Sequence, residues 1–142
     1  MTFQEKYNDP TGTYALESKT RKDGDDIYGY FGQIQVKRLT EKEIFMTFIV
    51  NKGAPSYNSG SFVDTLDYQI DKAIYVNPEL DPNCKITFDF TDKGVTVKEE
   101  TDNYNFGCGF GNVVVADGFF KMISSDEPEL RNPLTNEKIE SE

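Results

Sequence analysis

The sequence predicts an all-β protein, an antiparallel meander of about eight strands that closes into a small barrel or half-barrel. Helix signals are nearly absent, because no window sustains apolar residues at the i, i+3, i+4 and i+7 positions. Short runs that alternate apolar and polar residues recur along the chain, separated by Gly, Pro, Asn and Asp. The links between them are short, so neighbours are expected to be antiparallel, and closure removes exposed edges. A β-sandwich is the alternative.

The predicted strands run from Gly12 to Ile123. Their ranges are 12–17, 27–39, 44–50, 61–70, 73–76, 84–91, 95–99, 113–116 and 119–123. Two hairpin turns join the later strands, at Asp92-Lys-Gly94 and at Asp117-Gly118. The Asp-Gly pair is the strongest short hairpin signal in the chain.

The strand at 27–39 is long and carries two glycines. Gly29 and Gly32 stand where a sheet must bend or bulge. In the second half of this strand Ile34 and Val36 face one way and the polar residues beside them face the other. This alternation predicts a strand with one buried and one polar face.

Two polar segments interrupt the strands of the first half. Residues 22–26 are expected to form a loop. Residues 51–60 are expected to form a ten-residue polar loop, whose length and composition make it the best candidate for a functional loop.

The length of 142 residues corresponds to one domain that is large enough to bury a core. We expect the barrel domain to occupy residues 1–124. Residues 125–142 are heavily charged and are expected to form a loose polar tail, although Leu130, Leu134 and Ile139 could dock on a sheet face.

The chain has two cysteines, and we predict that they form a disulfide. Cys84 opens the alternating strand at 84–91, and Cys108 lies between Gly107 and Gly109, which leave room for another backbone to approach. A Cys84–Cys108 bridge closes a loop of about 25 residues, which stabilises the fold by roughly 3 kcal/mol in the chain-entropy view. Two buried free thiols are the alternative.

No enzyme, metal or cofactor chemistry is expected. The chain has no histidine, which excludes Ser-His-Asp and Cys-His catalysis, and a carboxylate pair is the only catalytic alternative. Two cysteines without Cys-x-x-Cys spacing do not form a zinc site. The run Asp23-Gly-Asp25-Asp26 lacks the twelve-residue calcium-loop pattern.

The net charge is −10, from 25 acidic and 15 basic residues. This charge argues against binding to nucleic acid and to anionic membranes, and no apolar run is long enough for membrane insertion. It would attract a basic protein partner, although solubility alone also explains it.

Tyrosines close to glycines, asparagines and serines have the composition of a protein-recognition surface. The candidate partner-binding residues are Tyr28, Tyr30, Tyr57, Asn58, Ser59 and Tyr104. The abundant phenylalanines are expected to fill the barrel, and the alternative is that they line a cavity for a small apolar ligand.

The chain resembles small secreted or lipoprotein β-barrel domains of bacteria, broadly similar to lipocalin-like and periplasmic lysozyme-inhibitor proteins. The segments that carry the resemblance are Gly12-Thr-Tyr14, Cys84-Lys-Ile-Thr-Phe-Asp-Phe90, Cys108-Gly-Phe-Gly111 and Ala116-Asp-Gly-Phe-Phe-Lys121. The resemblance implies an eight-stranded barrel with a disulfide and inhibition of a cell-wall hydrolase. No inhibitory loop of the known inhibitors maps residue by residue onto this chain.

These observations lead to two functional hypotheses. The first is a non-catalytic, acidic inhibitor or immunity-type protein that binds a basic hydrolase, either lysozyme-like or a toxin. The second is a lipocalin-like carrier of a small apolar ligand. The N-terminus has no apolar signal-peptide region. We favour a mature form that acts in the periplasm, the cell envelope or outside the cell, and a cytoplasmic protein is the alternative.

Overall fold

The computed structural model describes residues 9–139 except 19, 55–56, 78–80 and 101–116. The described residues contain nine strands and no helix. The strands are β1 (Gly12–Leu16), β2 (Arg21–Asp23), β3 (Asp26–Arg38), β4 (Glu43–Gly53), β5 (Ser59–Gln69), β6 (Lys72–Asn77), β7 (Asp81–Phe90), β8 (Gly94–Glu100) and β9 (Gly118–Ser124).

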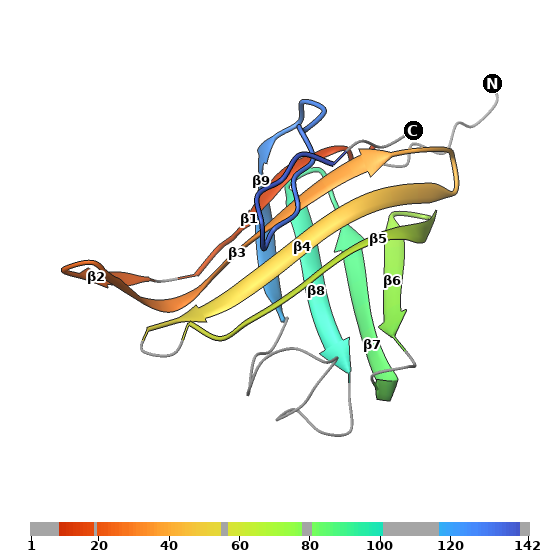
Figure 1. The fold of residues 1–142 in the computed structure, drawn as a ribbon. Helices are drawn as coiled ribbons and strands as arrows, with labels where there is room; N and C mark the ends of the chain where they lie inside the picture. Colours follow the sequence, from red (N-terminus) through yellow and green to blue (C-terminus); the bar gives the residue numbers. More distant parts are fainter. Residues whose placement is uncertain (1–8, 19, 55–56, 78–80, 101–116, 140–142) are drawn as a thin grey trace.

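Eight of these strands form a closed antiparallel barrel (Figure 1). Consecutive strands pair from β3 to β9, and β1 pairs with β9 on one side and with β3 on the other. The short β2 pairs only with β3 and lies outside the ring. The predicted all-β barrel is therefore confirmed, and the sandwich alternative does not apply. The predicted strand at 113–116 lies outside the described residues.

The bend predicted in β3 is present. The pairing of β3 with β4 shifts register between Tyr28 and Phe31, and Gly29 has a φ of 102° there. At Gly32 a Cβ atom would lie 2.5 Å from the carbonyl oxygen of Ile49, so only glycine allows this approach of the two strands.

Aromatic rings fill the interior. Phe48 lies at their centre, with ring centroids 5.3 Å from Phe62, 5.8 Å from Phe88 and 5.7 Å from Phe120. All four side chains are buried. These distances are those of favourable aromatic pairs, so the phenylalanines contribute both buried area and specific ring contacts.

The first half of the chain has less loop than the sequence predicts. Residues 21–23 are a strand, not a loop, because Asp23 pairs with Asp26 across the two-residue turn Gly24-Asp25. Gly24 has a φ of 64°, the positive value that tight hairpin turns require. The polar segment 51–60 is also shorter as a loop, because β4 continues to Gly53 and β5 begins at Ser59.

Residues 125–139 lie on the outer face of the barrel, which agrees with the docked alternative to a loose tail. Leu130 is buried, whereas Leu134 is exposed. The N–H of Ile139 donates to the carbonyl of Leu130 at 2.8 Å, and Arg131 pairs with Lys138 in an isolated β-bridge. The segment thus folds back on itself, which brings Leu130 onto the sheet.

Two buried tyrosines predict how stability depends on alkaline pH. Burial raises the pKa of Tyr14 and of Tyr68, and the hydrogen bond from Tyr68 to Asp71 at 2.9 Å adds to the rise for Tyr68. The pKa of each tyrosine is higher in the folded protein than in the unfolded chain, where it is about 10. The two tyrosines therefore contribute fully to folding stability below pH ~10, and this contribution is lost as pH rises through the folded pKa. Urea unfolding at pH 8 and 11 should show a smaller loss in the Tyr14→Phe/Tyr68→Phe variant than in the wild type. An equal loss in both proteins contradicts the prediction.

Candidate functional site

The most prominent surface feature is an arm that projects from the barrel (Figure 1). We define the arm as residues 20–31, which include β2 and the start of β3, and the described part of 51–60, which joins β4 to β5. β3, β4 and β5 are 13, 11 and 11 residues long, whereas β6 has 6 residues and β8 has 7. The extra length of the three long strands runs beyond the barrel and forms the arm.

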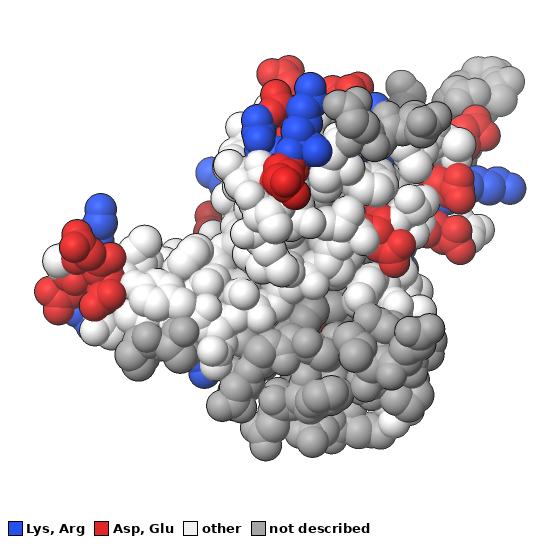
Figure 2. All heavy atoms as spheres, viewed as in Figure 1, with Lys and Arg blue, Asp and Glu red and all other residues white. Residues whose placement is uncertain are grey.

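Charged side chains gather at the tip of the arm (Figure 2). Asp23, Asp25 and Asp26 are all exposed at the β2–β3 turn. Arg21 lies 3.8 Å from Asp23, and its guanidinium is 4.4 Å from the centre of the Tyr28 ring. The exposed ion pair contributes little to stability, whereas the cation–π contact orders Arg21 along the arm.

Tyr57 links the two halves of the arm. Its hydroxyl accepts the N–H of Ile27 at 2.9 Å and donates to the carboxylate of Asp26 at 3.2 Å. Its backbone has a φ of 56°, which is rare for a bulky residue. The side chain nevertheless remains 36% exposed. A strained conformation that holds an aromatic side chain at the surface is typical of a functional position.

The turn that carries Tyr57 is fixed by hydrogen bonds. Asn51 accepts the N–H of Gly53 at 2.7 Å and donates to the carbonyl of Tyr57 at 3.1 Å. The N–H of Tyr57 donates to the carbonyl of Gly53 at 2.8 Å, and that of Lys52 donates to the carbonyl of Asn58 at 3.0 Å. These bonds hold Tyr57 in one orientation, so a partner would meet a preorganised surface.

Most of the predicted partner-binding residues lie on the arm. Tyr28, Tyr57, Asn58 and Ser59 come together there from two separate parts of the chain. Tyr30 lies at the base of the arm, is half-buried and packs against the barrel core. Tyr104 lies outside the described residues.

The predicted disulfide involves one described residue. Cys84 is buried on the inner face of β7. Cys108 lies outside the described residues, so the Cys84–Cys108 bridge stays a prediction.

Sequence reasoning did not find two features of the arm. It did not identify Asp26 as the partner of Tyr57, although the run of aspartates around Gly24 was visible as a turn. It also missed Gly53, where a Cβ atom would lie 2.5 Å from the carbonyl oxygen of Gly29 and 2.7 Å from that of Ile27. The signal for Gly53 was the Asn-Lys-Gly pattern at 51–53, which places an amide side chain two residues before a glycine.

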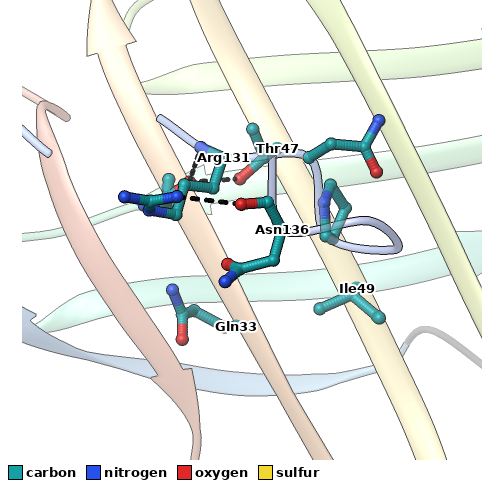
Figure 3. Close-up of a pocket in the computed structure, with 8 residues that line it drawn as sticks. Gln33, Thr47, Ile49, Arg131 and Asn136 are labelled. Carbon is teal, nitrogen blue, oxygen red and sulfur yellow. Dashed lines mark hydrogen bonds between the residues drawn. The ribbon is translucent and has the colours of Figure 1, made fainter. Parts of the chain in front are cut away.

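A small cavity lies beneath the C-terminal segment (Figure 3). Its volume is about 180 Å³, and Gln33, Thr47, Ile49, Arg131 and Asn136 lie around it. Ligand pockets usually exceed about 300 Å³, so we interpret this space as a gap left by docking of the segment and not as a binding site.

Gln35 holds that segment on the barrel. Its side-chain oxygen accepts from the hydroxyl of Thr47 at 3.1 Å and from the N–H of Arg131 at 3.0 Å. Its side-chain nitrogen donates to the carbonyl of Glu129 at 2.9 Å. An outward-facing glutamine of β3 thus acts as a clamp for residues 129–131.

In the part of the chain that the structure describes, no three His, Cys, Asp or Glu side chains gather in a way that could hold a metal ion. None of the described residues forms a helix long and apolar enough to cross a membrane.

Comparisons with protein-family models, with curated proteins and with solved structures give no match to this chain. The resemblance to lipocalin-like and lysozyme-inhibitor barrels therefore stays a prediction.

The close approach at Gly53 predicts a difference between two glycines of the arm. Gly53 and Gly24 both have positive φ, but only Gly53 meets neighbouring backbone, whereas a Cβ at Gly24 would meet nothing within 4 Å. Gly24→Ala should cost about 1 kcal/mol, and Gly53→Ala should cost about 2–4 kcal/mol because overpacking is added to the backbone strain. Urea unfolding measures both. Equal costs would mean that the two strands can separate at Gly53 without penalty.

The hydrogen bonds of Gln35 predict that its substitution destabilises the protein more than substitution of the nearby Gln33 does. Gln35→Ala removes two acceptor bonds and one donor bond, so unfolding free energy should fall by about 1–3 kcal/mol. Hydrogen exchange at the Arg131 amide should also accelerate, because that N–H loses its acceptor. Gln33→Ala, an exposed change on the same strand face, is the matched control and should alter neither quantity. Unchanged exchange at Arg131 in Gln35→Ala contradicts the clamp.

Proposed function

We propose that this protein is a non-catalytic binding protein that grips a basic protein partner with its arm, as an inhibitor or immunity-type protein does. The observation that carries the proposal is the rigid, exposed arrangement of Tyr57 and the aspartates at the arm tip. Tyrosine offers a large contact area at a small cost in side-chain entropy, so it suits such a surface.

The shape of the arm supports a hydrolase as the partner. An arm of paired strands that projects from the barrel can enter a concave cleft, and active sites of hydrolases lie in such clefts. Asp25 and Asp26 would then reach the cleft first. The net charge of −10 favours a basic partner, because opposite charge accelerates encounter and discriminates against acidic proteins.

The packed interior favours binding of a protein partner over transport of a small apolar ligand. Phe48, Phe62, Phe88 and Phe120 are in ring contact and occupy the middle of the barrel, where a carried ligand would have to lie. The cavity beneath the C-terminal segment and the groove between β5 and β6 both lie on the outside of the barrel.

The proposed site of action is the cell envelope or the exterior of the cell. A cell-wall hydrolase works there, and the Cys84–Cys108 disulfide that we predict would persist in that oxidising environment.

The test is binding and inhibition with a panel of basic hydrolases, lysozymes and nuclease toxins included, at low and high salt. We expect at least one partner to bind, with affinity that falls as salt rises. Asp25→Lys at the arm tip should weaken this binding by about tenfold or more, because it places a positive charge against a basic cleft. Asp126→Lys, an exposed and equal charge change in the C-terminal segment, is the control and should have a much smaller effect.

Two results would contradict the proposal. One is a failure to bind any basic hydrolase at low salt. The other is equal weakening by Asp25→Lys and Asp126→Lys, because overall charge and not the arm would then determine binding.

A further inference from the structure

The barrel has a seam between β5 and β6. β5 pairs with β4 from Ser59 to Asp67, but it pairs with β6 only at Tyr68 and Gln69, next to the turn. Beyond these pairs the two strands diverge (Figure 1). We define the seam as residues 61–67 of β5 and 74–76 of β6.

Backbone groups of β5 face this seam. The N–H of Tyr68 donates to the carbonyl of Lys42, which lies on the β4 side. Because successive residues of a strand direct their N–H and C=O groups to opposite sides, Asp67, Thr65 and Val63 direct theirs toward β6. Among the described residues no strand pairs with β5 there, and Val63, Asp64 and Thr65 are all exposed, as at the edge of a sheet.

The Asp64 carboxylate accepts a backbone hydrogen bond that a neighbouring strand would accept in a fully paired sheet. Asp64 alternates with the buried Phe62 and Leu66 and lies opposite the buried Met46, so it belongs to the inward face, yet it is exposed because the seam is open. Its carboxylate accepts the N–H of Thr65 at 2.8 Å. A side chain thus satisfies a backbone donor that would otherwise bond to a neighbouring strand.

A groove lies beside the β5–β6 turn, lined by the apolar Ile70 and Ile74 and by the polar Asp67, Gln69 and Lys72. Its volume is about 630 Å³. Ile70 has a φ of 52° and is 63% exposed, and Val76 further along β6 is 53% exposed. Ile70 and Asp71 form the two-residue turn between β5 and β6, which requires positive φ at both, and a β-branched residue is rare in such a turn.

The floor of the seam is closed by a ring contact. Phe62 of β5 and Tyr75 of β6 stack with centroids 3.9 Å apart and ring planes at 5° to each other. This stack joins the two strands where backbone pairing does not, so the seam is a shallow trough and not a hole into the core.

We propose that the seam binds an extended segment of a basic protein, which adds to the open edge of β5 as a further strand. The backbone of the segment would pair with Val63, Thr65 and Asp67, as in other cases of strand addition. Thr65 would exchange the Asp64 carboxylate for a carbonyl of the segment, and Asp64 would become available to a lysine or arginine.

The charges of the seam favour a basic occupant. Lys72, the basic residue of the groove, lies 3.5 Å from Asp89. In the part of the chain that the structure describes, neither Asp64 nor Asp67 takes part in an ion pair. Apolar side chains of the segment would contact Ile70, Ile74 and Val76. This site is separate from the arm and does not depend on its function.

The probe is a capped peptide of about nine residues that alternates lysine and valine, a length typical of a long strand. We expect it to bind and to shift the NMR amide signals of Val63, Thr65 and Asp67. The same peptide with alternate backbone nitrogens methylated should bind at least about tenfold more weakly, because it cannot donate to β5. Asp64→Asn should weaken binding about fivefold or more, whereas Asp126→Asn, an equal charge change at an exposed position of the C-terminal segment, is the matched control and should leave it unchanged.

Three outcomes overturn the proposal. The first is equal binding of the methylated peptide, since attraction would then be electrostatic only. The second is equal binding of a peptide with glutamate in place of lysine. The third is self-association of Asp64→Ala in sedimentation without peptide binding by the wild type, which would assign Asp64 to protection of the edge against a second copy. If the protein binds the peptide but binds no basic hydrolase, the result contradicts only the function proposed for the arm.

Discussion

The structure depends on closure of the sheet through β1, a strand of five residues that pairs with β3 on one side and β9 on the other. This strand joins the first and last parts of the barrel, which are more than 80 residues apart. Closure gives the interior its single core, in which Tyr14 of β1 packs edge-on against Phe90 at 5.8 Å. Without it, β3 and β9 would both be open edges, and the aromatic rings would face water.

Two features depart from a regular closed barrel: strands that extend beyond the ring, and a gap in the pairing between two neighbouring strands. The long β3, β4 and β5 overrun the ring and pair with one another beyond it, which produces the arm. β6 continues to Asn77 but pairs with β5 only at Lys72 and Ala73, and this divergence leaves the seam. Both candidate surfaces therefore lie along β5, where its pairing departs from that of a regular barrel.

The sequence predicts the strands well because alternation is a local signal. Ile34 and Val36 face the core, and Gly29 stands at the bulge, as their positions indicate. The pairing of β5 with β6 could not be predicted, because both segments alternate normally and their divergence depends on the twist of the whole barrel. The sequence identified Leu130 as a residue that could dock on the sheet, but not Gln35 as its anchor, because Gln35 reads as an ordinary exposed residue. On the arm, composition identified Tyr57 but not its bond to Asp26, which joins residues 31 positions apart.

Strain is concentrated at the two ends of β5. Tyr57 precedes the strand and Ile70 follows it, and both have positive φ although neither is glycine. Each such residue costs on the order of 1–3 kcal/mol, and a tightly packed barrel can tolerate this cost. A glycine or asparagine at either position would relieve it, so the turns alone do not explain these side chains. What Tyr57 and Ile70 share is exposure of a large side chain beside aspartates, Asp26 in one case and Asp67 in the other. The same combination, an apolar contact next to an acidic one, is what a basic protein surface would recognise at either end of the strand.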